Sequence, residues 1–211
     1  MSYTNLSISE TAPAVVKNFV RNQLDMQFAD INCMLRLPIH ELSLHAGFNF
    51  AAANSLLSLV SGIAALISPG INTQRQSGPK FKEVLKRYYP WDLQPPLPDG
   101  KDLEIVVDHL YEYLRNPLAH TLGLKPAGNF LVAIVKAPLT EEEVRKLETS
   151  DTPPYQAVEY TPIEINGEQI EQISLHIPAF YWGVRKMVTR LTEDQLQMAE
   201  TGKDLIALGL R

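Results

Sequence analysis

The chain has 211 residues, which is enough for one domain of ordinary size with a substantial core. Its apolar share of 45% and charged share of 20% are those of a folded soluble protein and exclude a disordered or fibrous chain. The net charge of −5 argues against a protein that coats nucleic acid, although it leaves room for a local basic patch.

The N-terminal residues carry no basic stretch followed by an apolar stretch, so they do not resemble a secretion signal. Cys33 is the single cysteine, which excludes an internal disulfide and a cysteine-rich metal site and fits a reducing compartment. Both features predict a cytoplasmic protein.

Apolar residues recur every three to four positions from residue 15 to residue 35, which predicts an amphipathic helix that Pro38 ends. The next stretch, residues 41–70, is apolar nearly all round and approaches the length of a membrane span. Asn49 and Asn54 would be costly in hydrocarbon, so we favour a buried central helix over a membrane span. No membrane association is therefore expected.

Residues 79–91 mix cations with aromatic side chains. Such a mixture can hold a nucleic-acid backbone while aromatic rings stack on bases. The favoured alternative is an ordinary short helix, begun by Pro79, whose aromatic residues are core and whose lysines are solvated. The candidate RNA-binding residues are Lys80, Lys82, Lys86 and Arg87.

The clearest helix of the sequence covers residues 101–116. Beyond Gly123 the helical periodicity gives way to runs typical of strands as well as helices. Its apolar stripe consists of Leu103, Val106, Val107, Leu110, Tyr111 and Leu114.

The C-terminal part of the chain predicts a mixture of strands and helices. Residues 130–137 are rich in branched side chains, which favours a strand, and residues 158–177 alternate around Asn166-Gly167, which favours a β-hairpin. Two helical stretches follow, the second with Thr192 as its expected cap. We therefore expect a mainly α fold, with a helical domain at residues 1–124 and a smaller α+β part at residues 125–211 packed on it.

A helix is also expected between these strands, at residues 139–148. Thr140 and Glu143 have the spacing of a capping box, in which each side chain bonds to the other residue's backbone. Glu141 and Arg145, and likewise Glu142 and Lys146, are four residues apart and would form ion pairs along the helix. These charges predict helix stabilisation and no chemistry.

The stretch Arg-Asn-Pro-Leu-Ala-His, residues 115–120, ends the clearest helix. In an unbroken α-helix, five residues would place Arg115 and His120 roughly 140° apart around the axis. Asn116 is a good N-cap and Pro117 is favoured at a first helical position, so we expect the helix to end or kink at Arg115. Such a break would turn a phosphate-binding guanidinium and a titratable imidazole toward one cleft.

This stretch resembles the Arg-x4-6-His motif of the HEPN superfamily, in which an asparagine often follows the arginine directly. The helical N-terminal half, residues 10–124, is also similar to that all-helical family. The resemblance implies metal-independent RNA cleavage, without a cofactor, at the interface of a homodimer in which two motifs meet. It implies that Arg115 binds the scissile phosphate, that His120 transfers a proton and that Asn116 orients the site.

The chemistry is also reasonable from the residues alone, because RNA carries its own nucleophile and needs only a proton shuttle and charge stabilisation.

The expected partners are a second copy of the chain, RNA, and an antitoxin or other regulatory protein. Members of the family often serve in toxin–antitoxin or antiviral defence systems, so the resemblance implies such a role.

Two alternatives stay open. The first is a HEPN-like module without catalysis that binds a nucleotide, RNA or a protein partner. The second is a purely structural helical protein, in which Arg115 pairs with Glu112 and His120 is a core histidine with its hydrogen bonds satisfied.

No metal site is expected. His40 and His45 of the stretch HELSLH are five residues apart, whereas the two zinc-binding histidines of the HExxH motif of zinc proteases are four apart.

Overall fold

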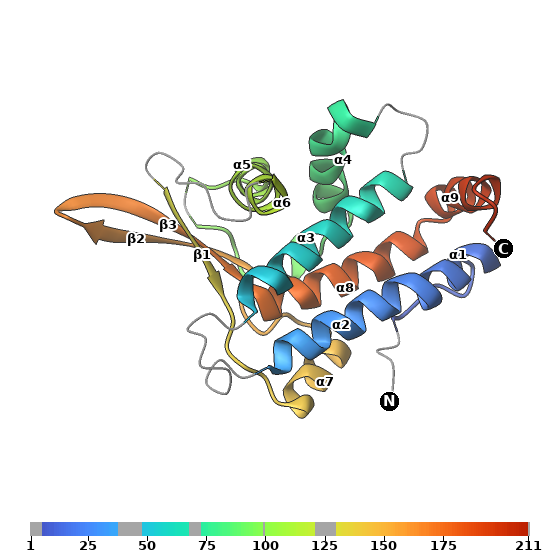
Figure 1. The fold of residues 1–211 in the computed structure, drawn as a ribbon, viewed down its shortest axis with the longest axis horizontal. Helices are drawn as coiled ribbons and strands as arrows, with labels where there is room; N and C mark the ends of the chain where they lie inside the picture. The colour runs from blue at the N-terminus through green and yellow to red at the C-terminus, as the bar shows by residue number, and fades with distance from the viewer. Residues whose placement is uncertain (1–5, 38–47, 68–72, 99, 121–129, 211) are drawn as a thin grey trace.

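The computed structural model describes residues 6–37, 48–67, 73–98, 100–120 and 130–210. Figure 1 shows their arrangement: long helices lie side by side, and a small sheet projects from one end of them. His40 and His45, for which we expected no metal site, lie outside the described residues.

The first helical unit consists of α1 (Ala14–Phe19), a π-helical segment η1 (Val20–Leu24) and α2 (Asp25–Arg36). Its buried residues recur with helical spacing and include Val16, Val20 and Phe28. The predicted amphipathic helix is therefore confirmed, although the wider π-helical turn within it was not predicted.

Helix α3 (Asn49–Leu66) contacts α2, α4 and α8, which places one of its sides in the core. Leu56, Val60 and Ile63 are buried on that side, whereas Phe50 remains 45% exposed. Within the described part of the chain, α3 is the one helix that is long and apolar enough to cross a membrane, and 44% of it is buried inside the fold. A cytoplasmic location therefore stays a prediction.

Helix α4 (Thr73–Tyr88) begins earlier than expected, because Pro79 lies inside it and does not start it. The aromatic residues Phe81, Tyr88 and Tyr89 are buried, as expected for core positions. A 3-10 turn, η3 (Trp91–Leu93), opens the connector to the helix that carries the motif. That helix comprises α5 (Leu103–His109), a π-helical segment η4 (Leu110–Arg115) and α6 (Asn116–His120).

Three strands form the sheet, in the order β1 (Phe130–Val135), β3 (Glu168–His176) and β2 (Val158–Ile165). Strand β1 runs parallel to β3 and β2 runs antiparallel to it. Asn166 and Gly167 join β2 to β3 with φ values of 54° and 84°, the left-handed conformation that a tight hairpin turn requires. The predicted strand and hairpin are both confirmed.

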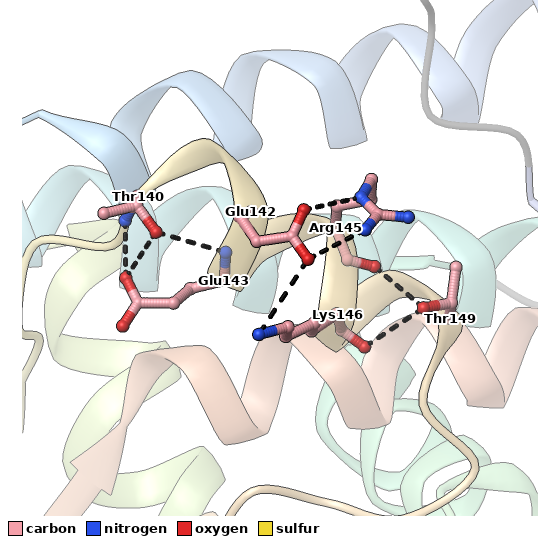
Figure 2. Close-up of polar contacts among 6 residues, drawn as sticks. All are labelled: Thr140, Glu142, Glu143, Arg145, Lys146 and Thr149. Atoms are coloured by element: carbon pink, nitrogen blue, oxygen red, sulfur yellow. Dashed lines mark hydrogen bonds and ion pairs between the residues drawn. The ribbon is translucent and has the colours of Figure 1, made fainter.

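Helix α7 (Glu141–Thr149) begins with the predicted capping box. The Thr140 hydroxyl accepts a hydrogen bond from the Glu143 backbone N–H at 3.2 Å, and the Glu143 carboxylate accepts one from the Thr140 backbone N–H at 2.7 Å (Figure 2). The cap satisfies backbone donors that a helix N-terminus otherwise leaves without partners.

The ion pairs of α7 differ in part from the expected ones. Arg145 pairs with Glu142 at 2.8 Å, three residues away, and Lys146 lies 3.8 Å from the same carboxylate (Figure 2). Glu141 is instead 3.8 Å from Arg36 of α2. The predicted pair of Glu141 with Arg145 was therefore wrong, because Glu141 faces a neighbouring helix.

Helix α8 (Ile177–Glu193) follows β3 directly and lies at the centre of the fold, in contact with α3, α4, α7 and α9 (Figure 1). Most of its residues are buried. Helix α9 (Gln195–Ala207) is capped by Asp194, which accepts a hydrogen bond from the Gln197 backbone N–H. Thr192 lies within α8, so its prediction as this cap was wrong.

The described residues share one hydrophobic core, which crosses the predicted boundary between residues 124 and 125. Phe28 and Leu56 from the first part and Ile173 and Phe180 from the second belong to this core. The fold is mainly α with a smaller α+β part, as the sequence predicted.

Candidate functional site

The helix that carries the motif does not end at Arg115, so of the predicted end or kink the end was wrong. Asn116 is helical, with φ −66° and ψ −49°, and its backbone N–H donates to the Tyr111 carbonyl, five residues back. Pro117 has no N–H, and in an ordinary α-helix its ring would clash with the carbonyl of Tyr113. The wider π-helical turn before the proline relieves this clash without ending the helix.

An unbroken helix keeps the two motif residues apart. Arg115 ends η4 and His120 ends α6, so the separation of roughly 140° that α-helical geometry gives still applies within one chain. Arg115 is half-buried, whereas His120 is exposed. Among the described residues, neither Asn116 nor His120 shares a hydrogen bond with Arg115.

Arg115 is held by α3. Its Nε donates a hydrogen bond to the Ser61 Oγ at 3.0 Å, and the Ser61 hydroxyl donates in turn to the Leu57 carbonyl at 3.0 Å. No carboxylate of the described residues forms an ion pair with Arg115; Glu112 instead lies 3.7 Å from Lys82. The pairing that a purely structural interpretation predicted is therefore absent from the described part of the chain.

The ring of Tyr111 lies near two cations. The Lys82 Nζ is 5.3 Å and the Arg115 Cζ is 5.9 Å from the centre of its ring. Helix α4 makes room for the ring with Gly78, because a Cβ there would come within 2.8 Å of it. Tyr111 therefore occupies a space that glycine leaves open.

The sequence did not indicate two of these contacts, that of Ser61 with Arg115 and that of Gly78 with Tyr111. A serine in a strongly apolar helix was a usable signal, because a buried hydroxyl needs a partner. Its partner could not be found without knowing which helices pack together.

A second cluster lies where the motif helix meets the sheet. His109 Nδ1 is 3.0 Å from the Tyr160 hydroxyl, and its ring packs against Tyr113 and Phe130. Burial and the nearby positive charge of Lys101 lower the pKa of His109. The sequence did not indicate this cluster, because its residues come from distant segments of the chain.

Three of the four candidate RNA-binding residues of α4 lie beside acidic residues. Lys86 lies 2.8 Å from Glu104, and Lys80 is buried. The other two ion pairs are Lys82 with Asp108 at 2.9 Å and Arg87 with Asp194 at 2.7 Å. These pairs join α4 to α5 and to the start of α9, so the cations have a structural use whether or not they bind RNA.

Within the described ranges, no group of three or more His, Cys, Asp and Glu side chains is arranged to hold a metal ion. An open, mainly apolar pocket of about 350 Å³ lies between α7 and the start of α8, where Leu147, Tyr155 and Pro178 line it. No motif residue lines this pocket.

Comparison of the chain with protein-family models, with curated proteins and with solved structures gave no match.

Proposed function

We propose that the chain is a HEPN-like, metal-independent endoribonuclease whose active site forms between two copies. The observation that carries the proposal is the state of Arg115, whose guanidinium is oriented by Ser61 and has no carboxylate partner among the described residues. A guanidinium that is held in place and not neutralised by a carboxylate is suited to bind a phosphate, through paired hydrogen bonds.

The reaction needs only groups that the motif supplies. The 2′-hydroxyl of RNA attacks the adjacent phosphorus, the bond to the 5′-oxygen breaks, and a 2′,3′-cyclic phosphate and a 5′-hydroxyl result. His120 transfers a proton to or from the reacting oxygens, and Arg115 stabilises the negative charge of the transition state. Asn116 orients the site.

Two copies are needed because the helix separates Arg115 from His120 within one chain. A two-fold axis beside α6 brings Arg115 of one copy toward His120 of the other and creates two equivalent sites. The exposure of His120 is compatible with such an arrangement.

The first experiment incubates the purified protein with a mixed RNA panel in EDTA, beside the Arg115→Ala and His120→Ala variants. All three proteins are first shown to be folded and to have the same oligomeric state. We expect cleavage by the parent alone, with 2′,3′-cyclic phosphate ends. Equal cleavage by all three proteins, or dependence on a divalent metal, would contradict the assignment.

A mixing experiment tests the shared site. The two inactive variants are unfolded together, refolded as a mixture and assayed. Each mixed dimer then has one complete pair of Arg115 and His120 across the axis, so activity returns to about one quarter of the parent's. No recovery, with mixed dimers demonstrated by mass, would place both residues in a site within one chain.

The unbroken helix supports a second candidate, a HEPN-like module that binds a nucleotide, RNA or a protein without cleavage. Binding of RNA that depends on Arg115, without any cleavage, would favour it. The family resemblance further supports a cytoplasmic role in toxin–antitoxin or antiviral defence, with an antitoxin or other regulatory protein as partner. Growth arrest on expression of the parent, but not of His120→Ala, is the expected sign of that role.

A further inference from the structure

The hydrogen bonds around Arg115 have a defined direction. The Ser61 hydroxyl has one proton and donates it in a hydrogen bond to the Leu57 carbonyl. Its oxygen can therefore only accept from the Arg115 Nε. Ser61 lies on α3, one turn after Leu57, so the backbone of a packed helix fixes the position of the hydroxyl.

An arginine can bind a phosphate in two forked ways, through Nε with one Nη or through both Nη groups. Ser61 occupies Nε of Arg115, so the first way is closed. The edge formed by the two Nη groups is then the one that a phosphate can bind through two hydrogen bonds.

From this geometry we infer that Ser61 is a positioning residue, which fixes the Arg115 guanidinium so that its Nη edge receives a phosphate of single-stranded RNA. This inference rests on the proposed function, because it assigns an RNA phosphate to Arg115. It adds a residue outside the motif, on a different helix, that controls how the motif arginine binds.

The test measures binding and not cleavage. The probe is an oligoribonucleotide of about ten nucleotides whose 2′-hydroxyls are all methylated, so that it cannot be cleaved by the proposed route. Its affinity is measured by fluorescence anisotropy for the full-length parent and for Ser61→Ala, Ser61→Thr and Arg115→Ala. Ser58→Ala serves as the matched control, because Ser58 is an exposed serine of the same helix.

We expect Ser61→Ala to weaken binding up to about tenfold, because the Arg115 side chain is then ordered only when it binds the phosphate. Ser61→Thr keeps the hydroxyl and should bind within a few-fold of the parent, as should Ser58→Ala. In an Arg115→Ala background, Ser61→Ala should have no further effect, because the two residues act through one contact.

Three outcomes would overturn the inference. Ser61→Ala could bind the probe as tightly as the parent does, or Ser61→Ala could weaken binding further in the Arg115→Ala background. In the third outcome, Arg115→Ala binds the probe as tightly as the parent. The assay of unmodified RNA is separate. If the probe binds as expected but unmodified RNA is not cleaved, the nuclease proposal fails while the role of Ser61 in phosphate binding stands.

Discussion

The Nδ1 atom of His109 lies 3.0 Å from the phenolic oxygen of Tyr160, and this contact joins the motif helix to the sheet. Burial and the charge of Lys101 lower the pKa of His109 below its ordinary value of 6.5. Between these two pKa values the unfolded chain binds more protons than the folded chain. The contribution of His109 to stability is therefore complete above pH 6.5 and is lost as the pH falls toward the folded-state pKa.

We therefore expect the parent to lose more stability on acidification than His109→Asn. Asparagine places a polar atom near the position of Nδ1, so it can keep the contact with Tyr160 without titrating. The free energy of unfolding is measured in urea from pH 8 to pH 5 for both proteins. Asp25, whose pKa is raised by burial, contributes equally to both and cancels in the difference. Parallel pH profiles would show that His109 does not titrate as described.

Gly78→Ala should destabilise the protein, although alanine is the better helix former. Its Cβ would lie 2.8 Å from the Tyr111 ring, so the ring must move, at a cost of about 1–3 kcal/mol. Gly62→Ala is the matched control in α3, where an added Cβ meets nothing within 4 Å and should stabilise by about 0.5–1 kcal/mol. Urea unfolding measures both. Stabilisation by both substitutions would show that Tyr111 moves at no cost.

Glu148→Gln should destabilise the protein by about 2–4 kcal/mol. The Glu148 carboxylate accepts hydrogen bonds from Tyr181 at 2.6 Å and Asn32 at 2.9 Å, and lies 3.8 Å from the buried Arg185 guanidinium. Glutamine removes the charge that faces Arg185. The change is measured as a free energy of unfolding.

The control for Glu148 is Asp151→Asn, which neutralises an exposed carboxylate 2.9 Å from Lys186 on the same helix as Arg185. Its cost should be below about 1 kcal/mol, because water screens exposed pairs. Equal effects of the two substitutions would mean that burial does not strengthen the pair of Glu148 with Arg185.

Pro117→Ala should lower RNA cleavage about tenfold or more, because it restores a backbone N–H and removes the ring that the π-helical turn accommodates. A return of η4 to α-helical geometry would rotate α6 by roughly 100° relative to α5. Pro79→Ala, which replaces a proline inside α4, should leave cleavage unchanged. Circular dichroism and RNA cleavage are measured for both. Parent-like cleavage by Pro117→Ala would show that the proline does not set the position of His120.

The α4 cations should contribute little to RNA binding if their ion pairs persist in the complex. Each cation that binds a phosphate of a single strand adds about 0.7 to the magnitude of the slope of log affinity against log salt concentration. We expect Lys82→Gln and Lys86→Gln to leave that slope unchanged and Arg115→Ala to reduce it. A reduced slope for either lysine variant would assign RNA binding to α4.

Local patterns were enough to predict most of the elements. The hairpin at Asn166-Gly167 and the capping box at Thr140 depend on residues close together in the chain, and both were confirmed. An end of the helix at Arg115 was predicted by the same kind of local rule, and the helix does not end there. Proline rules describe preferences of α-helices, whereas the chain accommodates Pro117 with a π-helical turn.

Contacts between distant segments could not be predicted. Ser61 and Arg115 are 54 residues apart, and His109 and Tyr160 are 51 residues apart. Such pairs depend on which helix faces pack together, and hydrophobic periodicity identifies a buried face without identifying its partner. The motif was therefore found from the sequence, while the groups that hold it were not.

The central place of α8 has a consequence for biosynthesis. Helices α3 and α4 bury part of their apolar surface against α8, which is made only after them and after the sheet. During translation those surfaces stay without their final cover until α8 leaves the ribosome, which is the stage at which incomplete chains aggregate. Nascent chains that end before Ile177 should therefore depend on chaperones far more than the finished protein does.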